Sequence, residues 1–148
     1  MSRAYRTFFG FQREPFSADL GIKDIMETAA LRAVAERFDY TISLGAMAMV
    51  IGEVGAGKST ALRWAANRLH PSEYRVLWVT ATTGSVLELY RQLLSALDID
   101  TASTSRAVMI RRINRQVREL VLGKKQRPVL IIDEASLLRL DVFTELHT

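Results

Sequence analysis

One stretch of eight residues, 52–59, constrains the fold of this chain more strongly than any other part of its sequence. It reads GEVGAGKS and fits the pattern G-x-x-x-x-G-K-[ST] without a mismatch. Glycines at these positions let the backbone turn tightly and expose consecutive N–H groups, which together form a cradle for anions. The pattern therefore predicts a phosphate-binding loop. The alternative, a glycine-rich turn that matches by chance, is rare in a chain of 148 residues.

The hydrophobic pattern on both sides of this loop predicts alternating strands and helices. Short apolar runs, typical of strands buried on both faces, occupy residues 46–52, 75–80 and 128–133. Helical spacing predicts helices at 24–38 and at 58–69. End signals predict three more: one that begins with a capping box at 85–88, one that runs from an N-cap within 103–105 to Gly123, and one that follows a cap at Asp141. We therefore expect an α/β fold, a P-loop NTPase three-layer sandwich with a parallel sheet.

Composition excludes several other classes of protein. Cysteine is absent, and His70 and His147 lie far apart, so we expect neither disulfides nor a zinc centre. The longest apolar runs have about six residues, whereas a membrane-spanning helix needs about 20. The N-terminus has no apolar stretch followed by a cleavage site. We therefore expect a cytoplasmic protein with no membrane-spanning segment and a single P-loop domain, residues 1–148.

Two acidic residues follow the apolar run at 128–133: Asp133 ends the expected strand and Glu134 comes next, which resembles a Walker B motif. Ligands of an open parallel sheet bind at the carboxyl ends of its strands, so both acids are expected beside the phosphate loop. Asp133 would then join Ser59 in holding Mg²⁺, and Glu134 would polarise the water that attacks the γ-phosphate. Alternatively, the acids cap the following helix or lie exposed.

Together the two motifs predict a site for ATP and Mg²⁺. Lys58 is expected to reach the β- and γ-phosphates and, with Glu134, to be catalytic, while Ser59 and Asp133 are the expected metal ligands. A Glu directly after the metal Asp resembles the ATPase branch of P-loop proteins, and no guanine-selecting motif is present, so ATP is favoured over GTP. The expected nucleotide-binding residues are Gly52, Glu53, Val54, Gly55, Ala56, Gly57, Lys58, Ser59 and Thr60.

The opening YRTFFGFQREPFS, with GEVGAGKST and VLIIDEASLL, resembles the start, phosphate loop and acidic strand of ExeA-type AAA+ ATPases. That family is associated with type II secretion and pilus biogenesis, and close relatives serve as transposition ATPases. The resemblance implies an AAA+-like domain. Residues 1–20 carry four Phe, one Tyr and Pro15, and this composition predicts an ordered N-terminal aromatic arm packed on the domain. By analogy, residues 8–16 would help to close the adenine pocket; plain core packing is the alternative.

The resemblance covers only about the first half of a family module. The next strand with its sensor residue, the arginine finger and the helical lid domain are absent, so the chain is expected to be C-terminally incomplete, a fragment of a protein that forms a homo-oligomer when complete. In the family's strand order, the next strand lies between the strands at 46–52 and 128–133. Its absence would leave a slot, unless another chain or segment fills it or the flanking strands close up.

Arg111, Arg115 and Arg118 share one face of the helix expected after residue 105. This face fits a contact surface for the phosphates of DNA or RNA; alternatively, it is the solvated face of an amphipathic helix. Further basic residues lie nearby: Arg106, Arg112, Lys124, Lys125 and Arg127. Three functions stay open: an ATPase that remodels a secretion-related protein assembly, a DNA-transposition helper ATPase, and a non-hydrolysing nucleotide-binding switch.

Overall fold

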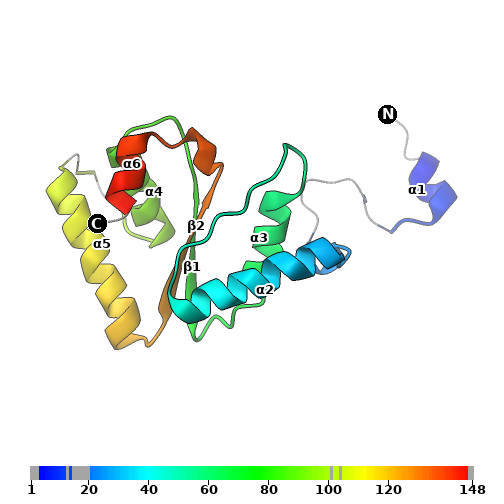
Figure 1. The fold of residues 1–148 in the computed structure, drawn as a ribbon, viewed down its shortest axis with the longest axis horizontal. Coiled ribbons are helices and arrows are strands. Elements are labelled where there is room, and N and C mark those ends of the chain that lie inside the picture. The colour runs from blue at the N-terminus through cyan, green and yellow to red at the C-terminus, as the bar shows by residue number, and fades with distance from the viewer. Residues whose placement is uncertain (1–3, 13, 15–20, 101, 104, 147–148) are drawn as a thin grey trace.

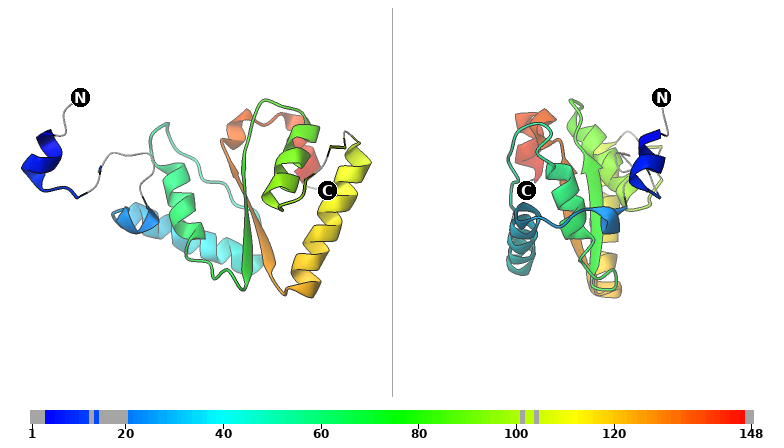
Figure 2. Two further views of the ribbon diagram at one scale, coloured as in Figure 1. Left: turned by 180° about the vertical axis from the view of Figure 1, so that it is seen from behind. Right: turned by 90° about the vertical axis from the view of Figure 1, so that its right-hand side faces the viewer.

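The computed structural model describes residues 4–12, 14, 21–100, 102–103 and 105–146. In this part of the chain, helices lie on both sides of a parallel sheet, and the three layers are visible in Figures 1 and 2. The α/β prediction is confirmed. No helix among these residues is both long enough and apolar enough to cross a membrane. His147 and residues 1–3, 13 and 15–20 of the predicted arm lie outside the described ranges.

The sheet of the described chain has two parallel strands, β1 (Tyr74–Thr80) and β2 (Arg127–Asp133). The strands are aligned residue for residue, so both end at the same level, with Thr80 opposite Asp133. The two apolar runs that predicted these strands are confirmed, each one residue longer at its amino end. The register matters for the site because it places the carboxyl end of β1 directly beside the predicted metal ligand.

The third predicted strand, at 46–52, is wrong. This segment has no strand partner in the described chain, where β2 pairs with β1 alone. Met47, Met49 and Ile51 are 77%, 71% and 84% exposed. A strand exists only where a neighbour pairs its N–H and C=O groups, which apolar residues alone cannot supply. The alternative in which the strand at 46–52 closes up against β2 is therefore also wrong.

The helix layer on one side of the sheet consists of α2 (Ala29–Leu44) and α3 (Lys58–Ala66), which pack against each other (Figure 1). Their buried residues are all alanines, Ala35, Ala61 and Ala65. Small side chains let two helix axes approach closely, because the distance between packed helices depends on the residues at the contact. α3 leads directly out of the phosphate loop, so this packing also fixes the direction of the loop.

The bounds predicted for α2, residues 24–38, are wrong, because the chain has stronger end signals further on. Thr28 Oγ1 accepts a hydrogen bond of 3.2 Å from the N–H of Leu31 and so caps the amino end of the helix. Gly45 takes a left-handed φ of 62° just after the last helical residue. The helix predicted at 58–69 begins as expected and ends three residues early.

The layer on the other side of the sheet contains α4 (Val86–Ala96), α5 (Arg106–Arg118) and α6 (Leu140–Leu146). α5 continues into a π-helical turn, η2 (Glu119–Gly123), and a 3-10 turn, η3 (Ala135–Leu137), precedes α6. The main core of the described chain lies here, because the apolar faces of these helices meet one another and β1. Its buried residues are Val79, Leu89, Tyr90, Leu93, Leu94, Met109 and Val142.

Most of the end signals predicted for these helices are wrong in detail. Ser85 and Ser105 stand at the N-cap positions of α4 and α5, but neither side chain makes a capping hydrogen bond. Asp141 lies inside α6 instead of before it. The helical backbone runs on through Gly123, and the left-handed residue is Lys125, with φ 56°. A cap contributes only about 1 kcal/mol, so these three helices form without side-chain caps because their apolar faces are buried in the main core.

The described part of the N-terminal arm contains a short helix, α1 (Ala4–Phe9), and the chain then reaches a 3-10 turn, η1 (Ile22–Asp24). The ring of Phe9 contacts the rings of Phe8 and Phe11, yet all three residues are exposed. The prediction that these aromatic residues pack on the domain is therefore wrong.

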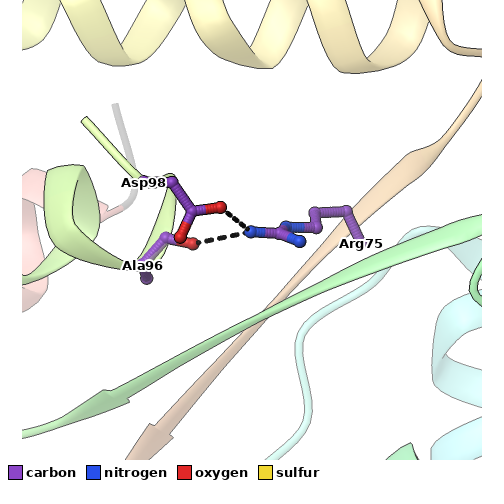
Figure 3. Close-up of polar contacts among 3 residues, drawn as sticks. All are labelled: Arg75, Ala96 and Asp98. Atoms are coloured by element: carbon purple, nitrogen blue, oxygen red, sulfur yellow. Dashed lines mark hydrogen bonds and ion pairs between the residues drawn. The ribbon is translucent and has the colours of Figure 1, made fainter.

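A clamp between Arg75 and the end of α4 ties this helix layer to β1 (Figure 3). The Arg75 guanidinium donates to Asp98 Oδ2 at 2.6 Å and to the carbonyl oxygen of Ala96 at 3.4 Å. Asp98 has a left-handed φ of 58°, and the N–H of Ile99 donates to the carbonyl oxygen of Leu94, which closes the helix. The clamp therefore supplies one of the last carbonyls of α4 with a donor.

Replacing Arg75 with alanine is expected to lower the free energy of unfolding by about 1 kcal/mol. The effect is small because the side chains of Arg75 and Asp98 are 39% and 81% exposed, and solvent screens such pairs. Asp98→Gly should be nearly neutral, because relief of the left-handed backbone offsets the lost ion pair. Urea unfolding at constant m-value measures both changes. A loss in Asp98→Gly as large as that in Arg75→Ala would contradict this account.

Candidate functional site

The phosphate loop needs glycine at two of its positions. Gly55 and Gly57 have φ of 82° and 79°, in the left-handed region that other residues rarely adopt. Gly57 is also the N-cap of α3, and its carbonyl oxygen accepts from the N–H of Ala61. Gly52 has no positive φ, and a Cβ built there would make ordinary contacts. The loop thus ends at a helix N-terminus, where backbone N–H groups and the helix dipole favour an anion.

Lys58 is folded back over its own loop. Its Nζ donates to the carbonyl oxygen of Gly52 at 3.0 Å and to that of Glu53 at 2.8 Å. These two contacts hold the ammonium group against the first two residues of the loop, so its positive charge lies close to the backbone of the loop. The third donor of the ammonium group has no partner among the described residues.

The two motifs meet through a single hydrogen bond. Ser59 Oγ donates to Asp133 Oδ1 at 2.9 Å, although the two residues are 74 positions apart. Ser59 comes from the first turn of α3 and Asp133 from the last position of β2, so the contact joins a helix layer to the sheet. A hydroxyl oxygen beside a carboxylate fits Mg²⁺, which is usually held by one or two carboxylates together with phosphates and waters. The predicted metal ligands are therefore neighbours, and their oxygens suit this ion.

Asp133 is fixed from several directions. Its carbonyl oxygen accepts from the N–H of Ala81 at 2.8 Å, which continues the strand pairing by one residue. The same Oδ1 that faces Ser59 also accepts from the N–H of Glu134 at 3.0 Å. This carboxylate is therefore held both by the sheet and by the turn that follows it.

Glu134 has an unusual backbone for a residue with a side chain. Its φ of 53° and ψ of 35° lie in the left-handed region, at the start of η3. Such a conformation in a non-glycine residue costs about 1 kcal/mol or more and concentrates at functional positions. The side chain is exposed and makes no hydrogen bond within the described residues, so the alternative in which Glu134 caps the following helical turn is wrong.

The structure does not gather every predicted residue at this point. Val54 points fully into solvent, and Thr60 is exposed on α3. α1, which carries part of the 8–16 region, lies away from the phosphate loop in both views of Figure 2. Residues 15 and 16 lie outside the described ranges, so a role of the arm at adenine stays a prediction.

The turn after β1 begins beside Asp133, because the N–H of Ala81 donates to the carbonyl oxygen of Asp133. Further along this turn, Thr82, Gly84 and Ser85 line a small hollow together with Leu138. No predicted site residue lines this hollow, so it is not assigned to the phosphate site.

The fold and this loop define a P-loop NTPase-type α/β domain. A family model described as an AAA domain matches residues 42–148, which is most of the chain. The chain therefore belongs to the AAA-domain family. Nucleotide binding and ATPase activity are properties of this family in general. No curated protein and no solved structure gives a significant match to the chain.

Gly57→Ala is expected to destabilise the protein by about 1–2 kcal/mol, because alanine must adopt a left-handed backbone at the N-cap of α3. A Cβ at Gly57 meets no atom within 4 Å, so the cost is conformational and not steric. Gly52→Ala is the matched control and should change the free energy of unfolding by less than about 0.5 kcal/mol. Equal losses in the two variants, measured by urea unfolding, would contradict the assignment of the left-handed position.

Proposed function

We propose that residues 52–60, together with Asp133 and Glu134, bind ATP with Mg²⁺ and hydrolyse it. The observation that carries the proposal is the 2.9 Å hydrogen bond between Ser59 and Asp133. It joins the phosphate loop to the acidic end of β2, so one oxygen ligand from each motif stands at the same point. Membership of the AAA-domain family supports the same activity.

In the proposed complex, ATP is bound by groups that already lie close together. The N–H groups of the loop and of the first turn of α3 donate hydrogen bonds to the phosphate oxygens, as N–H groups at helix N-termini do. Lys58 exchanges its contacts with the carbonyls of Gly52 and Glu53 for the β- and γ-phosphates, which carry full negative charge. Ser59 and Asp133 hold Mg²⁺, which neutralises charge on the phosphates when bound.

Hydrolysis requires a base near the γ-phosphate. Glu134 is the candidate because it directly follows Asp133 and because its carboxylate is exposed and has no partner in the described chain. A free carboxylate can accept a proton from an attacking water and orient it. The left-handed backbone of Glu134 sets the direction of its Cα–Cβ bond, so it restricts the region that the carboxylate can reach.

For the cellular role, we propose that hydrolysis drives the remodelling of a secretion-related protein assembly by a homo-oligomer, as the opening segment YRTFFGFQREPFS suggests. A DNA-transposition helper is the second candidate. The specific observation that favours it is the exposed basic face of α5, which carries Arg111, Arg115 and Arg118. A non-hydrolysing nucleotide-binding switch is the third candidate, and measurements of turnover separate it from the other two.

Lys58→Ala is expected to weaken ATP binding at least about tenfold, because it removes a charge-assisted hydrogen bond worth about 1.5–3 kcal/mol. Glu134→Gln should leave binding unchanged and lower turnover by about 10²–10⁴-fold. Calorimetry with ATP and Mg²⁺ measures the first effect, and phosphate release measures the second.

Glu119→Gln, a change of an exposed acid on η2, is the control and should alter neither quantity. If the wild-type chain binds ATP but releases no phosphate, the switch function holds instead. If Lys58→Ala binds ATP as tightly as the wild type, the proposed site is wrong.

A further inference from the structure

We propose that the exposed face of α5, with the turn that follows it, binds the phosphate backbone of double-stranded nucleic acid. This basic face consists of Arg111, Arg115, Arg118, Lys124 and Lys125, all of which are exposed. The inference deepens the second candidate function and rests on it for a cellular role: it extends the surface to Lys124 and Lys125 and names duplex phosphates as the ligand chemistry. It does not depend on the nucleotide site.

The packing of α5 directs the arginines outward. Met109 is fully buried in the main core, and Ile110 and Ile113 pack against the same core. Residues four and seven positions apart share a helix face, so Arg111, Arg115 and Arg118 form one stripe on the solvent side. The rise of 1.5 Å per residue spreads these three charges over about 10 Å.

These three arginines differ from the other arginines that the structure describes. Each of the others makes a hydrogen bond, an ion pair, an aromatic contact or another electrostatic interaction; Arg112 of the same helix, for example, donates to the carbonyl oxygen of Asp100 at 3.1 Å. Arg111, Arg115 and Arg118 make no such contact within the described residues. The arginines without partners are thus also those that share one face.

The charge around this stripe is one-sided. Glu119 is the single acid between residues 106 and 125. Like charges at i and i+4 destabilise a helix by about 0.2–0.5 kcal/mol per pair, so the arrangement costs stability unless an anion binds to it. A duplex presents one negative charge per about 1.7 Å of its axis, so a 10 Å stripe can contact several phosphates.

A duplex fits this face better than a single strand or a lipid surface does. No aromatic residue lies on it, and stacking on aromatic side chains is the usual means of holding single-stranded bases. A helix that lies in a membrane surface buries an apolar face in lipid, but the apolar face of α5 is already buried against α4. Val121 and Leu122, exposed at the end of the face, are the features that a lipid surface would use.

The basic face and the phosphate loop lie on opposite sides of the sheet. α5 is at one side of Figure 1, and α3 with the preceding loop is on the other side of β1 and β2. A nucleic acid bound on α5 would therefore not contact Lys58, and variants of the two surfaces can be tested independently.

The test is binding of a labelled DNA duplex of mixed sequence to the 148-residue chain, followed by fluorescence anisotropy over a salt series. The triple variant Arg111→Gln, Arg115→Gln, Arg118→Gln should weaken binding at least about tenfold at low salt. The slope of log K against log salt should fall by about 0.9 for each phosphate contact that is lost. Glutamine keeps helix propensity close to that of arginine, and circular dichroism checks that the variant is folded.

The matched control removes the same net charge from arginines that are in ion pairs elsewhere: Arg32→Gln, Arg91→Gln, Arg139→Gln. It should keep most of the affinity, and Lys58→Ala should bind the duplex like the wild type even where ATP binding is lost. Equal losses in the two triple variants would overturn the proposal, because net charge alone would then explain binding. So would the absence of duplex binding by the wild type, or binding to phosphatidylserine vesicles and not to the duplex.

Discussion

The candidate site depends on one hydrogen bond, from Ser59 to Asp133 at 2.9 Å. No strand pairing joins the segment at 46–52 to β2 in the described chain, so the loop and the acidic strand are not held together by a sheet. At the opposite end of β2, Arg127 donates to the carbonyl oxygen of Ile42 at 2.7 Å. Single polar contacts of this kind contribute about 1 kcal/mol each. Between these two ends, the guanidinium of Arg63 on α3 lies 5.7 Å from the centroid of the Trp78 ring on β1. The polar contacts that hold the α2–α3 layer on the sheet are therefore individually weak.

This division gives the two halves of the site different rigidity. Asp133 belongs to the firmer half, because its strand is paired along its length with β1, whose Val79 is part of the main core. Ser59 and Lys58 belong to α3 and the loop, where Ile51 and Val54 are almost fully exposed. Regions with few buried apolar contacts open at low free-energy cost. A ligand that contacts Lys58 and Asp133 together would add interactions across this boundary and so favour the assembled arrangement.

The sequence predicted those features that depend on local patterns. β1, β2 and α4 follow from their apolar runs and stripes, and the phosphate loop follows from its glycines. What failed depends on partners that a local pattern cannot reveal. Residues 46–52 have the composition of a buried strand but lack a neighbour to pair with, and the ends of α2 were set by Thr28 and Gly45 instead of by its apolar stripe. The left-handed backbone of Glu134 and the hydrogen bond from Ala81 had no sequence signal of their own.

The two roles proposed for the acidic pair share one atom. Asp133 Oδ1 accepts from Ser59 Oγ and from the N–H of Glu134. The second bond is local, because it joins two adjacent residues, and Glu134 then turns the chain out of the strand direction with its left-handed φ of 53°. One carboxylate oxygen thus orients the expected metal ligand of the loop and, through the backbone, the residue expected to act as base. A shift of Asp133 would move both groups together, so the position of the Ser59 hydroxyl and the position of the Glu134 backbone are coupled through this carboxylate.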